Sequence, residues 1–305
     1  MAGLIFRPRH QCARRGVDSI AVAVIYLIGI AGLATTALPA WKDGDKTGLS
    51  VPAARFQPKY EFQALEGRMS LGDDIRSDVN KLVSTAWTIR DGNVVPGTDD
   101  VKLYSNDAVK LDAVYLYADL LGSTKLARDF RPETAGKVIR ASLRTASTII
   151  KRHGGEIRSY DGDRVMAIFI GGSKNSNAVK AALKIKYAMK EIVQPSLYSR
   201  LPHLERDGFE PRMCVGIASG EAFIARAGVR DSSDLVSIGR APNVAAKLSD
   251  IRETGNYRTY ITADVYKVLS EETKLSRGKD MWEARSADVG GERMTIYRSS
   301  YWWSV

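Results

Sequence analysis

Two aspartates stand where the sequence predicts that neighbouring strands end. The stretch YLYADLLGST (115–124) is an apolar run that stops at Asp119, and Asp163 follows an Asp-Gly pair, a strong hairpin signal, in YDGDRVMAIF. Two carboxylates at one sheet edge form a site for hard divalent cations, Mg²⁺ or Mn²⁺, which prefer oxygen ligands and bridge to phosphates. Each aspartate alone is also typical of a turn or a cap, so the metal prediction depends on both together.

The turn after Asp119 carries small and hydroxylated residues. Gly122, Ser123 and Thr124 lead into a predicted helix, whose first backbone N–H groups could hold a triphosphate. We therefore assign these three residues, with Tyr117 on the preceding strand, to substrate binding. The stretch from Tyr115 to Thr124 therefore predicts a metal site next to a phosphate-binding turn.

The elements that must position these residues alternate between strand and helix after Met69. We expect a buried strand at 113–120, a helix at 132–155, two strands around the Asp161-Gly162 turn, a helix at 175–193 and a strand hairpin at 212–229. This order is the ferredoxin-like split βαββαβ arrangement, an α+β fold. Shorter helices and strands follow, and a strand at 293–300 closes a single domain over 69–305. Asp119 and Asp163 then lie at the same end of adjacent central strands.

The composition narrows the class of protein. The chain has 305 residues, 44% hydrophobic and 26% charged, which indicates a globular protein and excludes a disordered one. Cys12 and Cys214 lack metal-ligand spacing, so neither a disulfide framework nor a zinc site is predicted, and we expect a cytoplasmic protein. The net charge of +10 suggests an anionic partner such as a nucleotide, a nucleic acid or a membrane surface.

Residues 1–68 allow two interpretations. The segment 19–41 carries no charge, follows four arginines and is long enough to span a bilayer, so it predicts a membrane anchor or an uncleaved signal. The positive-inside rule would keep these arginines in the cytoplasm and place the rest of the chain outside the cell, where nucleoside triphosphates are scarce. Met69 is a second candidate start, which would make residues 1–68 a non-native extension outside the functional protein.

Four segments resemble, in order and at suitable intervals, the signature segments of class III nucleotidyl cyclases. They are YADLLGST, YDGDRVMAIF, CVGIASGEAFIARAGV and LVSIGRAPNVAAKL, and the likeness covers about residues 112–298. The resemblance implies a two-metal enzyme that joins the ribose 3′-hydroxyl to the α-phosphate and releases pyrophosphate. It also implies a head-to-tail homodimer, in which one subunit supplies the metal aspartates and the other supplies the transition-state residues.

The resemblance assigns roles to individual residues. Asp119 and Asp163 fall on the metal aspartates, Leu120 on the position of a backbone carbonyl ligand and Asn243 on the asparagine that orients the ribose. Lys247, four residues later on the same helical face, replaces the family's transition-state arginine. Lysine neutralises phosphate charge but lacks the planar fork of arginine. We therefore expect lower catalytic power or a different geometry of the bound phosphate.

The base-reading positions depart further from the purine cyclases. Ser159 and Val236 replace the residues that contact a purine, while Arg158 and Tyr160 add a guanidinium and bulk to the same strand. This pattern resembles the pyrimidine cyclases of the Pycsar bacterial antiphage systems. That likeness implies synthesis of cyclic UMP or cyclic CMP, with UTP favoured as substrate, and a product that activates a separate effector.

Two interpretations from other classes stay open. The Lys247 substitution suggests a degenerate cyclase module that binds a nucleotide without turnover, although Asp119, Asp163 and Asn243 are intact. A split βαβ sheet with a basic balance also suggests RNA binding, but such sheets stack bases on strand aromatics, and RVMAIFIGG offers one Phe. We therefore expect no nucleic-acid partner.

Overall fold

The computed structural model describes residues 70–305, which belong to one compact unit. Residues 1–69 lie outside the described residues, so both interpretations of the apolar segment 19–41 and the expected boundary at Met69 stay predictions. Within residues 70–305, no helix combines the length and the apolar character needed to cross a membrane.

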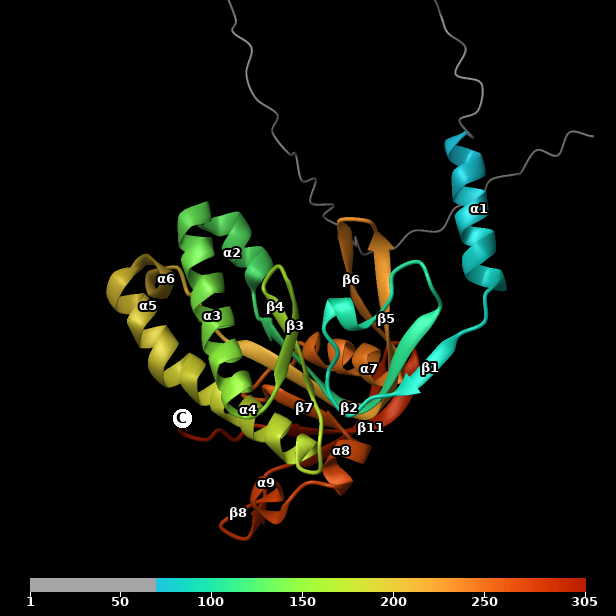
Figure 1. The fold of residues 1–305 in the computed structure, drawn as a ribbon. Coiled ribbons are helices and arrows are strands. Elements are labelled where there is room, and N and C mark those ends of the chain that lie inside the picture. The colour runs from blue at the N-terminus through green and yellow to red at the C-terminus, as the bar shows by residue number, and fades with distance from the viewer. Residues whose placement is uncertain (1–69) are drawn as a thin grey trace, which may run out of the picture. The chain divides into compact units, whose positions relative to one another are not determined.

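One mixed sheet organises the described residues, in the strand order β10-β11-β7-β5-β2-β4-β3 (Figure 1). The central strand β2 is antiparallel to both of its neighbours, β5 and β4. β1 pairs in parallel with the start of β2, and β6 pairs with the end of β5. The strands are β1 (Thr88–Asp91), β2 (Asp107–Leu120), β3 (Glu156–Asp161), β4 (Arg164–Phe169), β5 (Met213–Val229), β6 (Ser232–Ile238), β7 (Thr259–Thr262), β10 (Glu283–Val289) and β11 (Glu292–Ser299), with β8 (Leu275–Ser276) and β9 (Lys279–Asp280) in a separate ribbon.

Helices cover both faces of this sheet. They are α1 (Leu71–Ser84), α2 (Ser123–Asp129), α3 (Pro132–Arg152), α4 (Lys174–Ala188), α5 (Gln194–Arg200), α6 (His203–Arg206), α7 (Arg240–Ser249), α8 (Ala263–Lys267) and α9 (Glu271–Lys274), with a short 3-10 turn, η1 (Thr98–Asp100). Between α4 and α5 the chain continues as a π-helix, η2 (Met189–Val193). The described part of α1 is exposed along its whole length.

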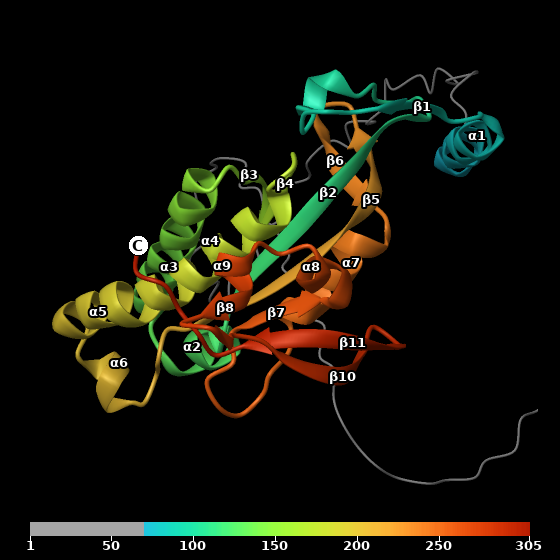
Figure 2. The ribbon, with the colours of Figure 1, turned by 90° about the horizontal axis from the view of Figure 1, so that it is seen from below.

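Alternate side chains of β2 enter two separate cores, because successive side chains on a strand point to opposite faces. Leu116, Ala118 and Leu120 pack in the core that contains the buried sides of α3 and α4. Tyr115 and Tyr117 pack in the core that contains the buried side of α7. Figure 2 shows α3 and α4 apart from α7, with β2 and β5 between them. Asp119 follows the alternation of Tyr115 and Tyr117 and faces the α7 side.

A glycine sets how closely α7 approaches the sheet. A Cβ atom added to Gly216 of β5 would lie 2.2 Å from the carbonyl oxygen of Ala245 and 2.4 Å from the backbone nitrogen of Ser249. Both are backbone atoms of the helix and cannot rotate away. The position of α7 over β5 therefore depends on the absence of a side chain at Gly216.

The predicted order of elements is confirmed, since β2, α3, β3, β4, α4 and β5 follow one another as a split βαββαβ fold with further strands and helices after it. The expected hairpin within 212–229 is wrong, because this segment is the single strand β5. Gly220, in the middle of this strand, pairs with Ala113 of β2, and its missing side chain leaves room for Ala241 of α7. β6 and β10 were not predicted.

Candidate active site

Asp119 and Asp163 meet at one end of β2 and β4. Asp119 is the penultimate residue of β2 and pairs in register with Arg164, the first residue of β4. Asp163 precedes Arg164 in the tight turn that Gly162 forms with a φ of +58°, in the left-handed region. The structure thus places the two predicted metal aspartates side by side, and Asp119 is only 4% exposed.

Two guanidinium groups hold the Asp119 carboxylate. Arg164 Nε lies 3.3 Å from Oδ1, and Arg252 Nη2 donates a hydrogen bond to Oδ2. Arg164 also pairs with Asp250 Oδ1 at 3.0 Å. Burial raises the pKa of Asp119 above its usual range, the charge of Asp163 raises it further, and the two arginines lower it only in part. Two crowded carboxylates at this sheet end favour a bound cation.

The donor set fits a hard divalent cation. Asp163 Oδ2 is buried and has no hydrogen-bond partner among the described residues, so a strong acceptor faces the site without a donor. Carboxylate oxygens are the ligands that Mg²⁺ and Mn²⁺ prefer. The described residues contain no group of three or more His, Cys, Asp and Glu side chains suited to a metal. Further ligands must therefore come from backbone carbonyls, as predicted for Leu120, from substrate oxygens or from water.

The turn after β2 presents the residues predicted to bind phosphate. The Leu120 side chain is buried, and Leu121 N–H donates to the Arg212 carbonyl at 2.8 Å, which fixes the exit of the strand. Gly122 has a φ of +79°, which favours glycine, and α2 begins at the next residue. Ser123 and Thr124 occupy the first turn of α2, where backbone N–H groups lack partners within the helix.

Asn243 and Lys247 lie on the exposed face of α7, and Asn243 is near the end of the helix that is away from Asp119. The first turn of α7 lies over Gly220, which pairs with Ala113, six residues before Asp119 along β2. At about 3.3 Å per residue this separates the start of α7 from the aspartate by roughly 20 Å. Neither Asn243 nor Lys247 makes a side-chain hydrogen bond or an ion pair within residues 70–305. One chain therefore does not bring Asn243 to Asp119. Lys247 lies one turn later, closer to the end of α7 where Arg252 binds Asp119.

The predicted base-reading residues divide between the two faces of the sheet. Ser159 and Tyr117 both pair with Met166 of β4, so they flank it on the α7 side. Tyr160 pairs with Val165 and points to the other side, where its hydroxyl lies 3.0 Å from Ser147 Oγ on α3. The expectation that Tyr160 adds bulk beside the base is therefore revised, because the structure does not bring it to the face of Asp119.

Arg158 and Val236 lie farther from the aspartates. A register shift between Ile157 and Ser159 places Arg158 in a β-bulge, which re-aims its side chain, and this side chain is half-buried. Val236 of β6 is 38% exposed and pairs with Ala225, at the end of β5 remote from Asp119. In one chain, Val236 does not approach the aspartates.

The arginines were not predicted as site residues. Arg164 directly follows Asp163 in DGDRV, so its place beside the predicted hairpin turn could have indicated a contact with the aspartates. Arg252 is separated from Asp119 by 133 residues and reaches it only because α7 ends beside β2. No pattern in the sequence pointed to that contact.

The comparisons with known proteins agree with this geometry. No family model matches the chain. It is 42% identical over 236 residues to a uridylate cyclase of Rhodovulum sp. (strain MB263), which covers 77% of this chain and 98% of that protein. It is 38% identical over 237 residues to a uridylate cyclase of Xanthomonas perforans, covering 78% of this chain and 100% of that one.

Solved structures share the fold at low identity. The guanylyl cyclase Cya2 matches with a TM-score of 0.52 and 19% identity, over 64% of this chain and 94% of that one. A bacterial light-regulated adenylyl cyclase matches with a TM-score of 0.53 and 20% identity, over 62% of this chain and 52% of that one. These likenesses confirm the predicted fold class. The 42% identity over nearly the whole length of a uridylate cyclase shows that the chain belongs to the uridylate cyclases, a family of nucleotidyl cyclases.

Proposed function

We propose that this enzyme converts UTP to 3′,5′-cyclic UMP with release of pyrophosphate. The observation that carries the proposal is the buried Asp119 beside Asp163, whose Oδ2 is buried and has no hydrogen-bond partner among the described residues. Relatives named uridylate cyclase, at 38–42% identity over nearly their whole lengths, support the choice of UTP.

The reaction makes one bond and breaks another at the α-phosphorus. The ribose 3′-oxygen attacks, its proton leaves, and the bond from the α-phosphorus to the oxygen that bridges to the β-phosphate breaks. Two divalent cations held by Asp119, Asp163 and the Leu120 carbonyl would stabilise the attacking and leaving oxygens. Ser123 and Thr124, at the start of α2, bind the phosphates of the substrate in this proposal.

A second copy of the chain completes the site. Asn243 would orient the ribose, and Lys247 would neutralise charge on the phosphate as pyrophosphate leaves. Both residues lie on an exposed helix face, and Asn243 is remote from the aspartates of its own chain, which supports a head-to-tail homodimer with shared sites. Ser159 and Tyr117, on the α7 side of the sheet, then border the base.

The biological setting is proposed from the resemblance to Pycsar cyclases. We place the enzyme in the cytoplasm, as the synthase of an antiphage second messenger that acts on a separate effector.

A chain that begins at Met69 tests the two interpretations of residues 1–68. Full activity of this shorter chain favours a non-native extension. Lost activity, with the longer chain found in membranes, favours an anchor.

One assay tests the proposed reaction. Purified protein is incubated with Mn²⁺ and each of UTP, CTP, ATP and GTP, and the products are identified by mass spectrometry. Cyclic UMP from UTP, absent with the Asp119→Ala variant, is the expected result. Cyclic CMP as the main product would favour the cytidylate alternative, a purine product would overturn pyrimidine selection, and no product at all would favour a degenerate binding module.

A further inference from the structure

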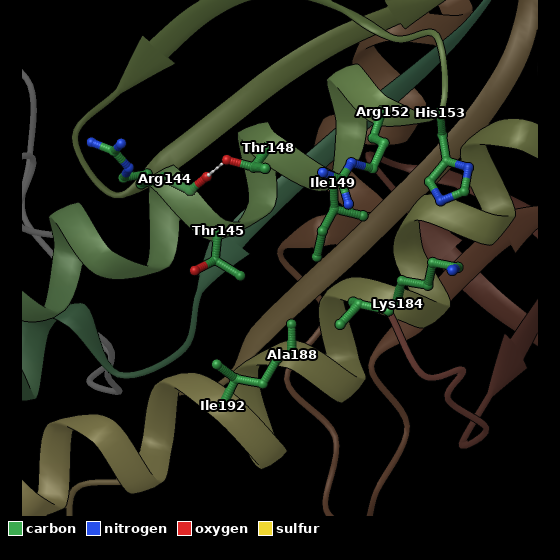
Figure 3. A pocket seen from close by; sticks show the side chains of 10 residues that line it. Arg144, Thr145, Thr148, Ile149, Arg152, His153, Lys184, Ala188 and Ile192 are labelled. Carbon is green, nitrogen blue, oxygen red and sulfur yellow. Dashed lines mark hydrogen bonds between the residues drawn. The ribbon is translucent and has the colours of Figure 1, made fainter.

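A pocket of about 410 Å³ opens on the helical side of the domain, away from the aspartates (Figure 3). It lies between α3 and α4, at the junction of α4 with the π-helix η2. The core shared by β2, α3 and α4 separates it from the α7 side of the sheet, where Asp119 lies. Its size falls within the range typical of small-molecule sites, roughly 300–1,000 Å³.

The interior of the pocket is aliphatic. Ile149 of α3 and Ala188 of α4 are buried side chains of its lining, and Ile192 of η2 is 46% exposed there. Thr145 contributes a methyl group and a hydroxyl. This lining removes apolar surface of a ligand from water, and it holds no Phe, Tyr or Trp ring on which a nucleobase could stack.

The rim of the pocket is cationic. Arg144 and Arg152 of α3 and Lys184 of α4 line it, and none of the three makes an ion pair within residues 70–305. Figure 3 shows Arg152, His153 and Lys184 close together, with Arg144 farther along α3. Burial lowers the pKa of His153, and the charges of Lys184, Lys180 and Arg152 lower it further, so positive charge predominates around this side chain. Val305, the last residue of the sequence, also lines the pocket.

A second, more open groove continues this positive surface along α3. It shares Arg144 and Thr148 with the pocket and is also lined by Lys137, Arg140 and Lys151. Clustered charges of one sign raise the local concentration of oppositely charged ligands. The groove therefore guides an anion toward the rim.

The backbone at the pocket also departs from regular helix. η2 is a π-helical stretch of five residues between α4 and α5, and it carries Ile192 into the pocket lining. Single-turn π insertions cost stability relative to a continuous α-helix and occur frequently at functional sites. The irregular turn thus coincides with the opening between the helices.

We propose that this pocket is a ligand site, separate from the active site, for an anion with an apolar body, such as an alkyl phosphate or an alkyl carboxylate. The apolar body lies against Ile149, Ala188 and Ile192, and the anionic head group pairs with Arg152 and Lys184. The ligand must match both parts of the lining. A site for inorganic phosphate needs no aliphatic interior, and a site for a neutral apolar ligand needs no cationic rim.

Isothermal titration of the full-length chain with octyl phosphate tests the proposal. We expect one saturable site, and inorganic phosphate and octanol should each bind at least about tenfold more weakly because each supplies only half of the recognition. Ile192→Glu and Arg152→Gln should each weaken octyl phosphate binding about tenfold. Both side chains are exposed, so these variants keep the fold.

Matched controls carry the same changes elsewhere. Val268→Glu alters an exposed apolar residue, and Lys279→Gln removes an exposed cation, and neither residue lines the pocket. These controls should bind octyl phosphate as the parent does. No saturable binding, equal affinity for inorganic phosphate, or equal affinity across all four variants would overturn the proposal.

His153 gives a second readout that does not depend on activity. Its imidazole NMR signals, assigned with His153→Gln, should titrate at higher pH when octyl phosphate is bound, because an anion offsets the charges of Lys184, Lys180 and Arg152. An unchanged titration of His153 in the saturated protein would place the ligand elsewhere and overturn the assignment.

Vesicles distinguish the natural source of the head group. If the ligand is a membrane lipid, phosphatidylcholine vesicles containing phosphatidylglycerol should sediment the parent more than Ile192→Glu or Arg152→Gln. If it is a free amphipathic anion, octyl phosphate binds with the same dependence on these residues, and sedimentation does not differ between parent and variants.

Discussion

The two halves of the proposed active site differ in how the chain holds them. Asp119 and Asp163 are set into the end of the sheet, where Asp119 is 4% exposed and two arginines bind its carboxylate. Asn243 and Lys247 lie on an exposed helix face and make no side-chain polar contact within the described part of the chain. The first half is organised by folding alone. The second half contributes to catalysis only when a second copy of the chain docks on α7, so a variant can fold normally and still be inactive.

Removing a metal ligand should have the largest effect. Asp119→Ala or Asp163→Ala should lower cyclisation at least about 10³-fold, because each removes a proposed ligand of the cations that stabilise both reacting oxygens. Turnover is measured with UTP and Mn²⁺, and circular dichroism verifies the fold. Asp161→Asn, on the same hairpin but exposed, is the matched control and should retain activity. Near-normal turnover in a folded Asp119→Ala protein would refute the metal assignment.

Mixing two dead variants should restore activity if the halves come from different chains. Asp119→Ala and Asn243→Ala subunits, combined after dissociation, form heterodimers in which one of the two sites is complete. Random mixing of equal amounts then gives about one quarter of the parent activity, because half of the dimers carry one intact site. Mixtures that stay inactive, although mass spectrometry detects the heterodimer, would place all catalytic residues in one chain.

Lys247 tests the exposed half directly. Lys247→Met should reduce kcat by about 10²-fold, since one charged contact to the phosphate in the transition state is lost. Lys247→Arg should retain or increase kcat, because guanidinium supplies two donors in a fixed fork. The side chain is exposed, so thermal unfolding of both variants should match the parent. Equal kcat in Lys247→Met and the parent would remove this residue from the mechanism.

Base choice should respond to Arg158 and not to Tyr160. Arg158→Ala should lower kcat/KM for UTP about tenfold if its guanidinium contacts a uracil carbonyl. Tyr160→Ala should leave the ratio of UTP to ATP turnover unchanged, because its hydroxyl contacts Ser147 on the opposite side of the sheet. The assay compares kcat/KM for four nucleotides across the parent and both variants. A gain of ATP turnover in Tyr160→Ala would restore this residue to the base pocket.

The pH dependence of metal binding should show the smallest effect. Because burial and Asp163 raise the pKa of Asp119, protons compete with the cation at higher pH than at an ordinary aspartate. Mn²⁺ affinity should therefore be full above the raised pKa and fall as the pH drops through it, by a few-fold over about one pH unit. Titration with Mn²⁺, followed by electron paramagnetic resonance, measures this affinity at each pH. An Mn²⁺ affinity that does not change until the pH reaches the usual pKa of aspartate would contradict the prediction.

Local signals predicted the buried half of the site better than the exposed half. The end of β2 and the Asp-Gly turn are encoded by neighbouring residues, so the placement of Asp119 and Asp163 followed from the sequence. The direction of Arg158 did not, because the bulge between Ile157 and Ser159 interrupts the alternation of β3 at this residue. Arg252 could not be predicted either, since only packing of α7 brings it to Asp119.

The close contact at Gly216 has a consequence for how this protein can vary. Because any side chain there would meet the α7 backbone at 2.2 Å, even Gly216→Ala must push the helix outward. Such a shift would move Asn243 and Lys247 relative to the partner's nucleotide, and it would also displace Arg252, which follows α7 and binds Asp119. A residue that touches no substrate would then be as intolerant of natural substitution as a metal ligand, because its loss would disturb both the exposed face of α7 and the arginine that holds Asp119.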